Sequence, residues 1–209
     1  MLQNLDSTLK SLIEEKLPEN LPSYLSKVTV TFNTPLSRES FEDQLPAINF
    51  FLYDVRENLE LRNSAWVVER QNDGTALKKR PPARVDCSYL ITAWPSDDDI
   101  ETDDIETEHE LLGEVMKVLL RHRKIPEEHV KDDFKGQEFS LRLISLRPSF
   151  LQSFGEFWQA MGGRDGTKPK VVLHCTVTIS VPLDEADEVV GLVGVYQPNG
   201  NTTTTTGTT

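Results

Sequence analysis

Basic residues are scarce in this sequence. Its 209 residues include 22 Lys and Arg against 34 Asp and Glu, which leaves a net charge of -12. Nucleic acids and anionic membrane surfaces both recruit proteins through clustered cations. The charge balance therefore argues against either of them as the main partner.

Cysteine is rarer still. Cys87 and Cys175 are the two cysteines in the chain, and each lies in an alternating, strand-like segment. This placement predicts buried, reduced thiols. No metal-ligand spacing links the four histidines, and we expect neither a bound metal nor a cofactor. These histidines are His109, His122, His129 and His174.

Motifs for catalysis are also missing. The sequence contains no G-x-S-x-G elbow and no recognisable cysteine-nucleophile motif. Residues 162–168 contain glycines, threonine and lysine, as a phosphate loop does, but the lysine follows the threonine and a strand-like segment comes next. We therefore expect a non-enzymatic protein.

Long apolar runs are absent as well. A signal peptide begins with a basic stretch followed by an apolar one, and the first six residues show neither. No apolar run approaches the roughly 20 residues that span a bilayer. These features predict a cytoplasmic protein without direct membrane insertion.

What the sequence does contain is a set of periodic segments. Leucines at helical spacing predict a helix over 2–17, and strict alternation predicts a strand over 170–181. An apolar run over 47–55 predicts a strand covered on both faces. The same criteria predict further helices at about 107–123 and 150–161, and further strands at 27–32, 66–70, 85–94 and 139–147.

These elements predict an α/β (α+β) fold, with a mixed, mainly antiparallel sheet and flanking helices. A long hairpin is expected to pair 66–70 with 85–94 around turn residues 72–75. Two prolines, at 81 and 82, indicate that the intervening stretch leaves the sheet or lies at its edge. We expect one domain over 1–184 and a C-terminal extension over 185–209, with a disordered threonine-rich end from about 198.

Residues 97–110 hold nine carboxylates. Such a block predicts a solvated loop, and a cation-binding module is the alternative. Thr107 and Glu110 have the spacing of a capping box, which predicts a helix start at that point.

Two charged segments are candidate interfaces. The first follows the apolar strand and carries Tyr53, Arg56, Glu57 and Arg62, in a setting that also fits an exposed turn with local ion pairs. The second segment has three adjacent cations in an otherwise acidic chain, and we expect it to bind an acidic surface of a partner. It consists of Lys78, Lys79 and Arg80.

Several segments together resemble one protein family. They are 48–58 (INFFLYDVREN) with Leu61 and Arg62, 80–94 with its SYLITAW run, 108–113 (EHELLG), and 157–163 (FWQAMGG). In this order they resemble the cap, or tail-terminator, proteins of phage-tail-like contractile injection systems of the antifeeding prophage and Photorhabdus virulence cassette type. The resemblance covers about residues 1–184.

The resemblance implies a fold similar to phage tail terminators and a structural role. The chain would form a homo-oligomer, a hexameric ring, on the end of the inner tube and sheath and stop their polymerisation. Residues 170–181 and 188–196 are candidates for adding a strand to a neighbour. Alternatives are another structural adaptor of such a particle, of the baseplate or head-completion type, or a small ligand- or cation-binding module.

Overall fold

The chain divides into two compact units in a computed structural model. The first unit comprises Met1–Arg62 and Pro82–Val181, and the second comprises Asn63–Pro81 with Pro182–Thr209. The expected division at residue 184 stays a prediction, and the predicted helix at 150–161 and the threonine-rich end lie outside the described residues. The structure describes residues 1–17, 28–34, 43–70, 75–95, 104–137, 139–145, 170–183 and 189–191.

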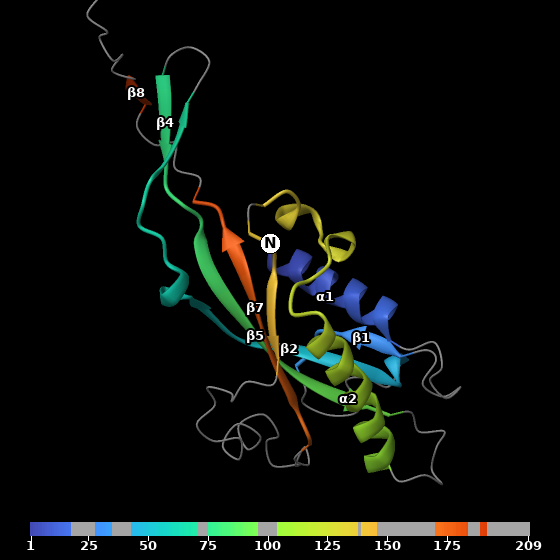
Figure 1. The fold of residues 1–209 in the computed structure, drawn as a ribbon. Coiled ribbons are helices and arrows are strands. Elements are labelled where there is room, and N and C mark those ends of the chain that lie inside the picture. The colour runs from blue at the N-terminus through green and yellow to red at the C-terminus, as the bar shows by residue number, and fades with distance from the viewer. Residues whose placement is uncertain are drawn as a thin grey trace, which may run out of the picture. The chain divides into compact units, whose positions relative to one another are not determined.

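A five-stranded sheet forms the centre of the first unit (Figure 1). β1 runs parallel to β2, and the other neighbouring pairs are antiparallel. The mixed, mainly antiparallel sheet expected from the sequence is thus confirmed. In spatial order the strands are β1 (Thr29–Thr31), β2 (Ala47–Glu57), β5 (Ala83–Trp94), β7 (Leu173–Val181) and β6 (Arg142–Ser145).

Two of the expectations about these strands are wrong. β7 lies between β5 and β6, so this strand is not an edge that could extend a neighbour's sheet. β2 is buried on both faces only over its first four residues, and its last three residues are exposed. The apolar run of β2 therefore ends at the margin of the core, and its charged end faces solvent.

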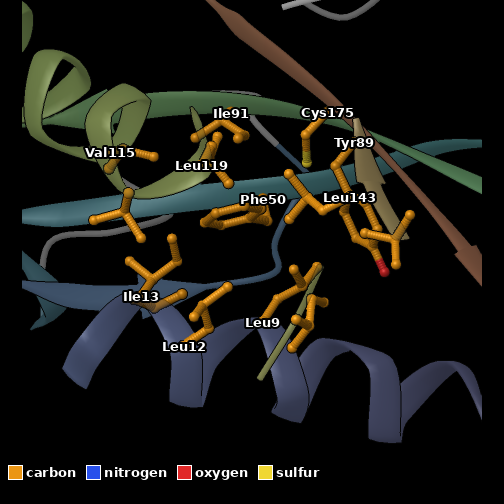
Figure 2. Packing of buried hydrophobic residues seen from close by; sticks show 14 of the residues in the cluster. Leu9, Leu12, Ile13, Phe50, Tyr89, Ile91, Val115, Leu119, Leu143 and Cys175 are labelled. Atoms are coloured by element: carbon orange, nitrogen blue, oxygen red, sulfur yellow. The ribbon is translucent and has the colours of Figure 1, made fainter. Parts of the chain in front are cut away.

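Helices α1 (Leu2–Lys16) and α2 (Asp104–Arg121) pack on the sheet from one side, as Figure 2 shows. Alternate strand residues point to the same face, which explains why every second residue of β5 meets the helices. The predicted apolar stripe of α2 is buried, and that of α1 is buried except at its ends, since Leu2 is exposed and Leu17 is half-buried. The core joins, among others, Leu9, Leu12 and Ile13 of α1, Val115 and Leu119 of α2, and Phe50, Tyr89, Ile91, Leu143 and Cys175 of the strands.

The start of α2 differs from the sequence prediction. The helix begins at Asp104, so Thr107 lies inside it and is buried, and the predicted capping box is wrong. Glu108 is buried one residue later, where its carboxylate lies 2.5 Å from Nζ of Lys170. That ammonium also lies 4.6 Å from the ring centroid of Trp94. The acidic block thus supplies the first turns of a helix, whose positive dipole end favours carboxylates.

The second unit contains a three-stranded antiparallel sheet. Its strands are β3 (Val67–Arg70), β4 (Thr75–Lys79) and β8 (Val189–Gly191), with β4 in the middle. The predicted pairing of 66–70 with 85–94 is wrong, because β3 pairs with β4 and residues 85–94 belong to the other sheet. Because β8 pairs with β4, part of the segment 188–196 is engaged within its own chain.

Short 3-10 helices connect these elements: η2 (Leu59–Leu61), η4 (Glu127–His129) and η5 (Asp132–Phe134). Cys87 and Cys175 are buried free thiols, as predicted, and burial raises the pKa of each to about 12. No described helix combines the length and the apolar character that a membrane crossing requires.

Candidate interaction surfaces

Tyr53 is separated from the charged residues that follow it in the sequence. The β2–β5 ladder pairs Leu52 with Tyr89 and Asp54 with Ser88, so Tyr53 is the extra residue of a β-bulge. Bulges redirect side chains. The Tyr53 hydroxyl lies 2.5 Å from Nε2 of His174 on β7, and burial raises the pKa of the phenol. Tyr53 therefore belongs to the sheet face, not to the exposed end of β2.

That sheet face lies opposite the two helices and carries a ladder of polar contacts. Each contact joins direct cross-strand neighbours of β5 and β7. Thr178 donates to Asp86 over 2.6 Å, the hydroxyls of Ser88 and Thr176 lie 3.1 Å apart, and Arg84 donates to Ser180 over 2.5 Å. Because these buried groups hydrogen-bond to one another, the polar face is compatible with a stable sheet.

The other three candidates of this segment take part in two separate ion pairs. Arg62 binds Glu57 with two hydrogen bonds of 2.7 and 2.5 Å, and this contact lowers the pKa of the Glu57 carboxylate. Arg56 donates to Asp54 over 2.6 Å. All of these charges are at or near the surface, where one ion pair contributes only about 0–1 kcal/mol. They form a charged surface around the end of β2.

Exposed apolar side chains also occur in this charged segment. Leu59 and Leu61 of η2, with Val55 of β2, are exposed, and Leu59 is 67% exposed. We call these three residues the apolar knob. Sequence reasoning missed it, since the two leucines alternate with charged residues as in an ordinary turn.

Asn58 fixes the position of the knob. Its backbone N–H donates to the carbonyl of Arg84 over 2.8 Å, and its Nδ2 donates to Asp86 over 2.9 Å. Its Oδ1 accepts from the backbone N–H of Leu61 over 3.0 Å. One side chain thus ties η2 to the middle of the sheet.

The basic candidates lie in the second unit. Lys78 and Lys79 are in β4, where their backbones pair with Val68 and Val67 of β3. The expectation that this stretch leaves the sheet or lies at its edge is confirmed: Lys78 and Lys79 pair with β3 alone, because the β8 pairing stops at Leu77, and β4 ends before Arg80 and the two prolines. Arg80 follows β4, is exposed, and lies over the ring of Trp66 at 5.3 Å.

A groove opens on the first unit between residues 124–130 and 134–141. Its volume is about 450 Å3. Among its lining residues, Ile125, Phe134 and Leu141 are buried and Phe139 is 44% exposed. We call it the β6-edge groove, because its walls lead into the outermost strand on that side. Its lining comes from segments that the sequence alone does not bring together.

One group of possible metal donors occurs in the described parts of the chain, formed by Glu15, Glu128 and His129. Nζ of Lys16 already lies 2.7 Å from the Glu15 carboxylate and 3.9 Å from that of Glu128. The ring of His129 is buried against Ser11, and burial lowers its pKa. A lysine thus supplies positive charge at this cluster, as in an ordinary surface ion-pair network.

Comparison with solved structures places the fold among the terminators of contractile injection systems. One similar solved structure is the sheath/tube terminator of an extracellular contractile injection system (PVC) in its extended state. It shares 19% sequence identity with this chain and has a TM-score of 0.65 over 99% of it. The second is the tube-terminating cap of the anti-feeding prophage, with 22% identity and a TM-score of 0.63 over 94%. The chain spans 65% and 60% of those two proteins.

The family is shown by sequence. Residues 4–193 match the Pvc16 N-terminal domain, and the chain belongs to that family. A comparison with curated proteins finds no match. The resemblance derived from residues 1–184 is therefore confirmed.

Proposed function

We propose that this chain is a structural cap, the terminator that ends the polymerisation of tube and sheath in a contractile injection particle. The observation that carries the proposal is family membership over residues 4–193, joined to a terminator fold over 99% of the chain. A cation-binding module is less well supported, because Asp104–Glu110 of the acidic block belong to α2.

The cap acts as a homo-oligomeric ring, with six copies as the expected number. A closed ring needs two different, complementary surfaces on each copy. The charged end of β2, with Arg56, Glu57 and Arg62, supports a role in such contacts because it combines paired surface charges with the exposed side chains of Leu59 and Leu61. The ring sits on the last layer of tube and sheath, and the particle assembles in the cytoplasm.

The second unit supplies the contact to the particle in this proposal. Lys78, Lys79 and Arg80 place three cations on and beside β4 in a chain of net charge -12. They suit an acidic surface at the end of the polymer, and repetition around a ring multiplies a weak individual contact. The role is structural, not catalytic.

Deleting the gene from a particle-producing strain tests the proposal. We expect tubes and sheaths that are unstable, absent or variable in length, because the growing end stays open. Complementation with the gene should restore uniform particles, and averaging of particle ends should place the protein at the end away from the baseplate. Uniform particles in the deletion strain, or density for the protein at another position, would contradict a terminator and favour another adaptor.

A further inference from the structure

Arg84 is a buried cation that forms no ion pair within the described parts of the chain. The residue is 6% exposed. Its guanidinium donates to the Ser180 hydroxyl over 2.5 Å and lies 4.6 Å from the ring centroid of Phe139, and neither partner carries negative charge. A guanidinium stays protonated in proteins. Because a buried, unpaired charge destabilises a fold, the position of Arg84 calls for a reason beyond packing.

A second arginine lies near Arg84 on the same face of the sheet. Arg142 of β6 pairs with Thr178 of β7, and Ser180, the partner of Arg84, follows two residues later on β7. Direct cross-strand partners and alternate residues of a strand share a face. Burial lowers the pKa of Arg84, and the charge of Arg142 lowers it further. Arg142 itself is exposed, and no described carboxylate forms an ion pair with it.

Asp86 is a carboxylate of β5 on this face, but it does not neutralise the two arginines. Its oxygens accept hydrogen bonds from Thr178 over 2.6 Å and from Asn58 over 2.9 Å. Its charge raises the pKa of Arg84, but this effect is smaller than the opposing effects of burial and of Arg142. We call Arg84 and Arg142 the arginine pair. The pair thus retains positive charge in a chain whose net charge is -12.

The chemistry of the arginine pair fits a carboxylate. A guanidinium presents forked N–H donors that match the two oxygens of a carboxylate. Another copy of this chain offers many such groups, since it has 34 Asp and Glu against 22 Lys and Arg. Copies of equal net charge repel one another at a distance, so a contact between them is favoured where cations of one copy meet carboxylates of the other. The arginine pair lies in the first unit, whereas the proposed particle contact lies in the second.

We propose that the arginine pair of one copy binds the carboxylate of an acidic side chain on a second copy, as part of the contact that closes the ring. Arg142 forms the exposed end of this site and Arg84 its buried end. The inference rests on the proposed cap function and adds a binding site between copies. A buried cation that destabilises the single chain gains its counterion on assembly.

A methionine substitution at Arg84 tests the site. Arg84→Met removes the charge and keeps a flexible, unbranched side chain beside Phe139, so the melting temperature of the isolated chain should stay level or rise. Association should become at least about tenfold weaker, because a carboxylate of the partner loses its buried counterion. An arginine with a merely structural role predicts the reverse, a lower melting temperature and unchanged association. Thermal unfolding and analytical ultracentrifugation measure the two quantities.

A second variant covers the case in which Arg84→Met fails to fold. Arg142 is exposed, so Arg142→Met should keep the melting temperature while association weakens. Arg121→Met is the matched control, because Arg121 is an exposed arginine of α2, the helix on the other side of the sheet. This control should associate as the wild type does. If the wild type assembles only on particle ends, the amount of each variant bound there replaces the solution measurement.

Inorganic phosphate probes the site without a partner subunit. At equal ionic strength, phosphate in place of chloride should raise the melting temperature of the wild type more than that of the double variant Arg84→Met, Arg142→Met, because a ligand stabilises the protein that binds it. An equal rise in both proteins would overturn an anion site. A larger rise in the wild type, together with normal rings from both single variants, would show that the site binds a free anion and would overturn the contact with a second copy.

Different outcomes separate this inference from the proposed function. Normal rings from folded Arg84→Met and Arg142→Met would overturn the arginine site and leave the cap function standing. A wild-type chain that stays monomeric and is absent from particles would overturn the ring itself.

Discussion

Burial at single residues determines which protonation states the folded chain tolerates. His174 lies on the polar face of β7, buried, with Tyr53 as the titratable group hydrogen-bonded to it. Burial lowers the pKa of its imidazole below the usual value near 6.5. His129 is shifted in the same direction for the same reason.

A pH dependence of stability follows. Below about pH 6.5 the unfolded chain takes up protons on these histidines while the folded chain does not. The free energy of unfolding should therefore fall as the pH drops from about 6.5 towards the lowered folded-state pKa. Above about pH 6.5 these two histidines should make no further contribution to its pH dependence. Urea unfolding of the wild type between pH 5 and 8 measures it.

Variants assign the effect to its source. His174→Gln keeps a hydrogen-bond partner for Tyr53 but cannot titrate, so its stability should vary less with pH than that of the wild type. His109→Gln is the control, because His109 is exposed on α2. An unchanged slope in His174→Gln would show that burial of this imidazole does not control the transition.

The residue scale also marks a limit of sequence reasoning. The apolar run over 47–55 correctly places Phe50 in the core. A bulge at Tyr53 cannot be read from such a run, because a run without alternation does not show where one extra residue shifts the register. For that reason Tyr53 was grouped with Arg56 and Glu57, although its side chain contacts His174 on β7.

At the scale of elements, the Glu108–Lys170 pair joins α2 to the segment before β7. The side chains are only 11% and 16% exposed, and Lys170 lies over Trp94. Removing one partner of a buried pair leaves an uncompensated charge and costs roughly 3–5 kcal/mol, whereas replacing both with apolar groups costs much less. The pair therefore suits a double-mutant cycle.

We expect Glu108→Leu to lower the free energy of unfolding by about 3 kcal/mol. The double variant Glu108→Leu, Lys170→Met should be more stable than Glu108→Leu alone, because the methionine can pack on the Trp94 ring without a charge. Urea unfolding of the wild type and both variants measures these differences, provided that the dependence of the free energy of unfolding on urea concentration is the same in all three. Additive losses would indicate that the two side chains act independently and that the contact contributes little.

Elements with long apolar stripes were predictable, and their pairing was not. The leucines of α1 and the alternation of β7 identify those elements because packing follows their period. The partner of β3 was missed because Thr75–Lys79 offers two lysines and little alternation, although it directly follows the predicted turn. The β6-edge groove depends on segments brought together only by folding, so no local pattern indicates it.

At the scale of the whole molecule, the division into units has a consequence for stability. The first unit leaves off at Arg62 and resumes at Pro82. Glu57 pairs with Val85, which brings the two ends of the sheet together. Arg62 follows Glu57 by five residues and Pro82 precedes Val85 by three. A linker of ten Gly and Ser residues spans up to about 35 Å, which covers that separation, so it can replace Asn63–Pro81 without straining the first unit.

We expect this linker variant to keep the melting temperature of the first unit and its ring, because the core and the charged end of β2 lie outside the replaced segment. It should fail to bind particle ends, since it lacks Lys78, Lys79 and Arg80. The charge-reversed variant Lys78→Glu, Lys79→Glu, Arg80→Glu keeps the hairpin and isolates the electrostatic part. Its docking should be weaker than that of wild type, and wild-type docking should weaken as added salt shortens the screening length. Co-sedimentation with particles measures both variants. A linker variant that unfolds would show that the two units depend on each other, and one that caps particles normally would show that the basic strand plays no part in docking.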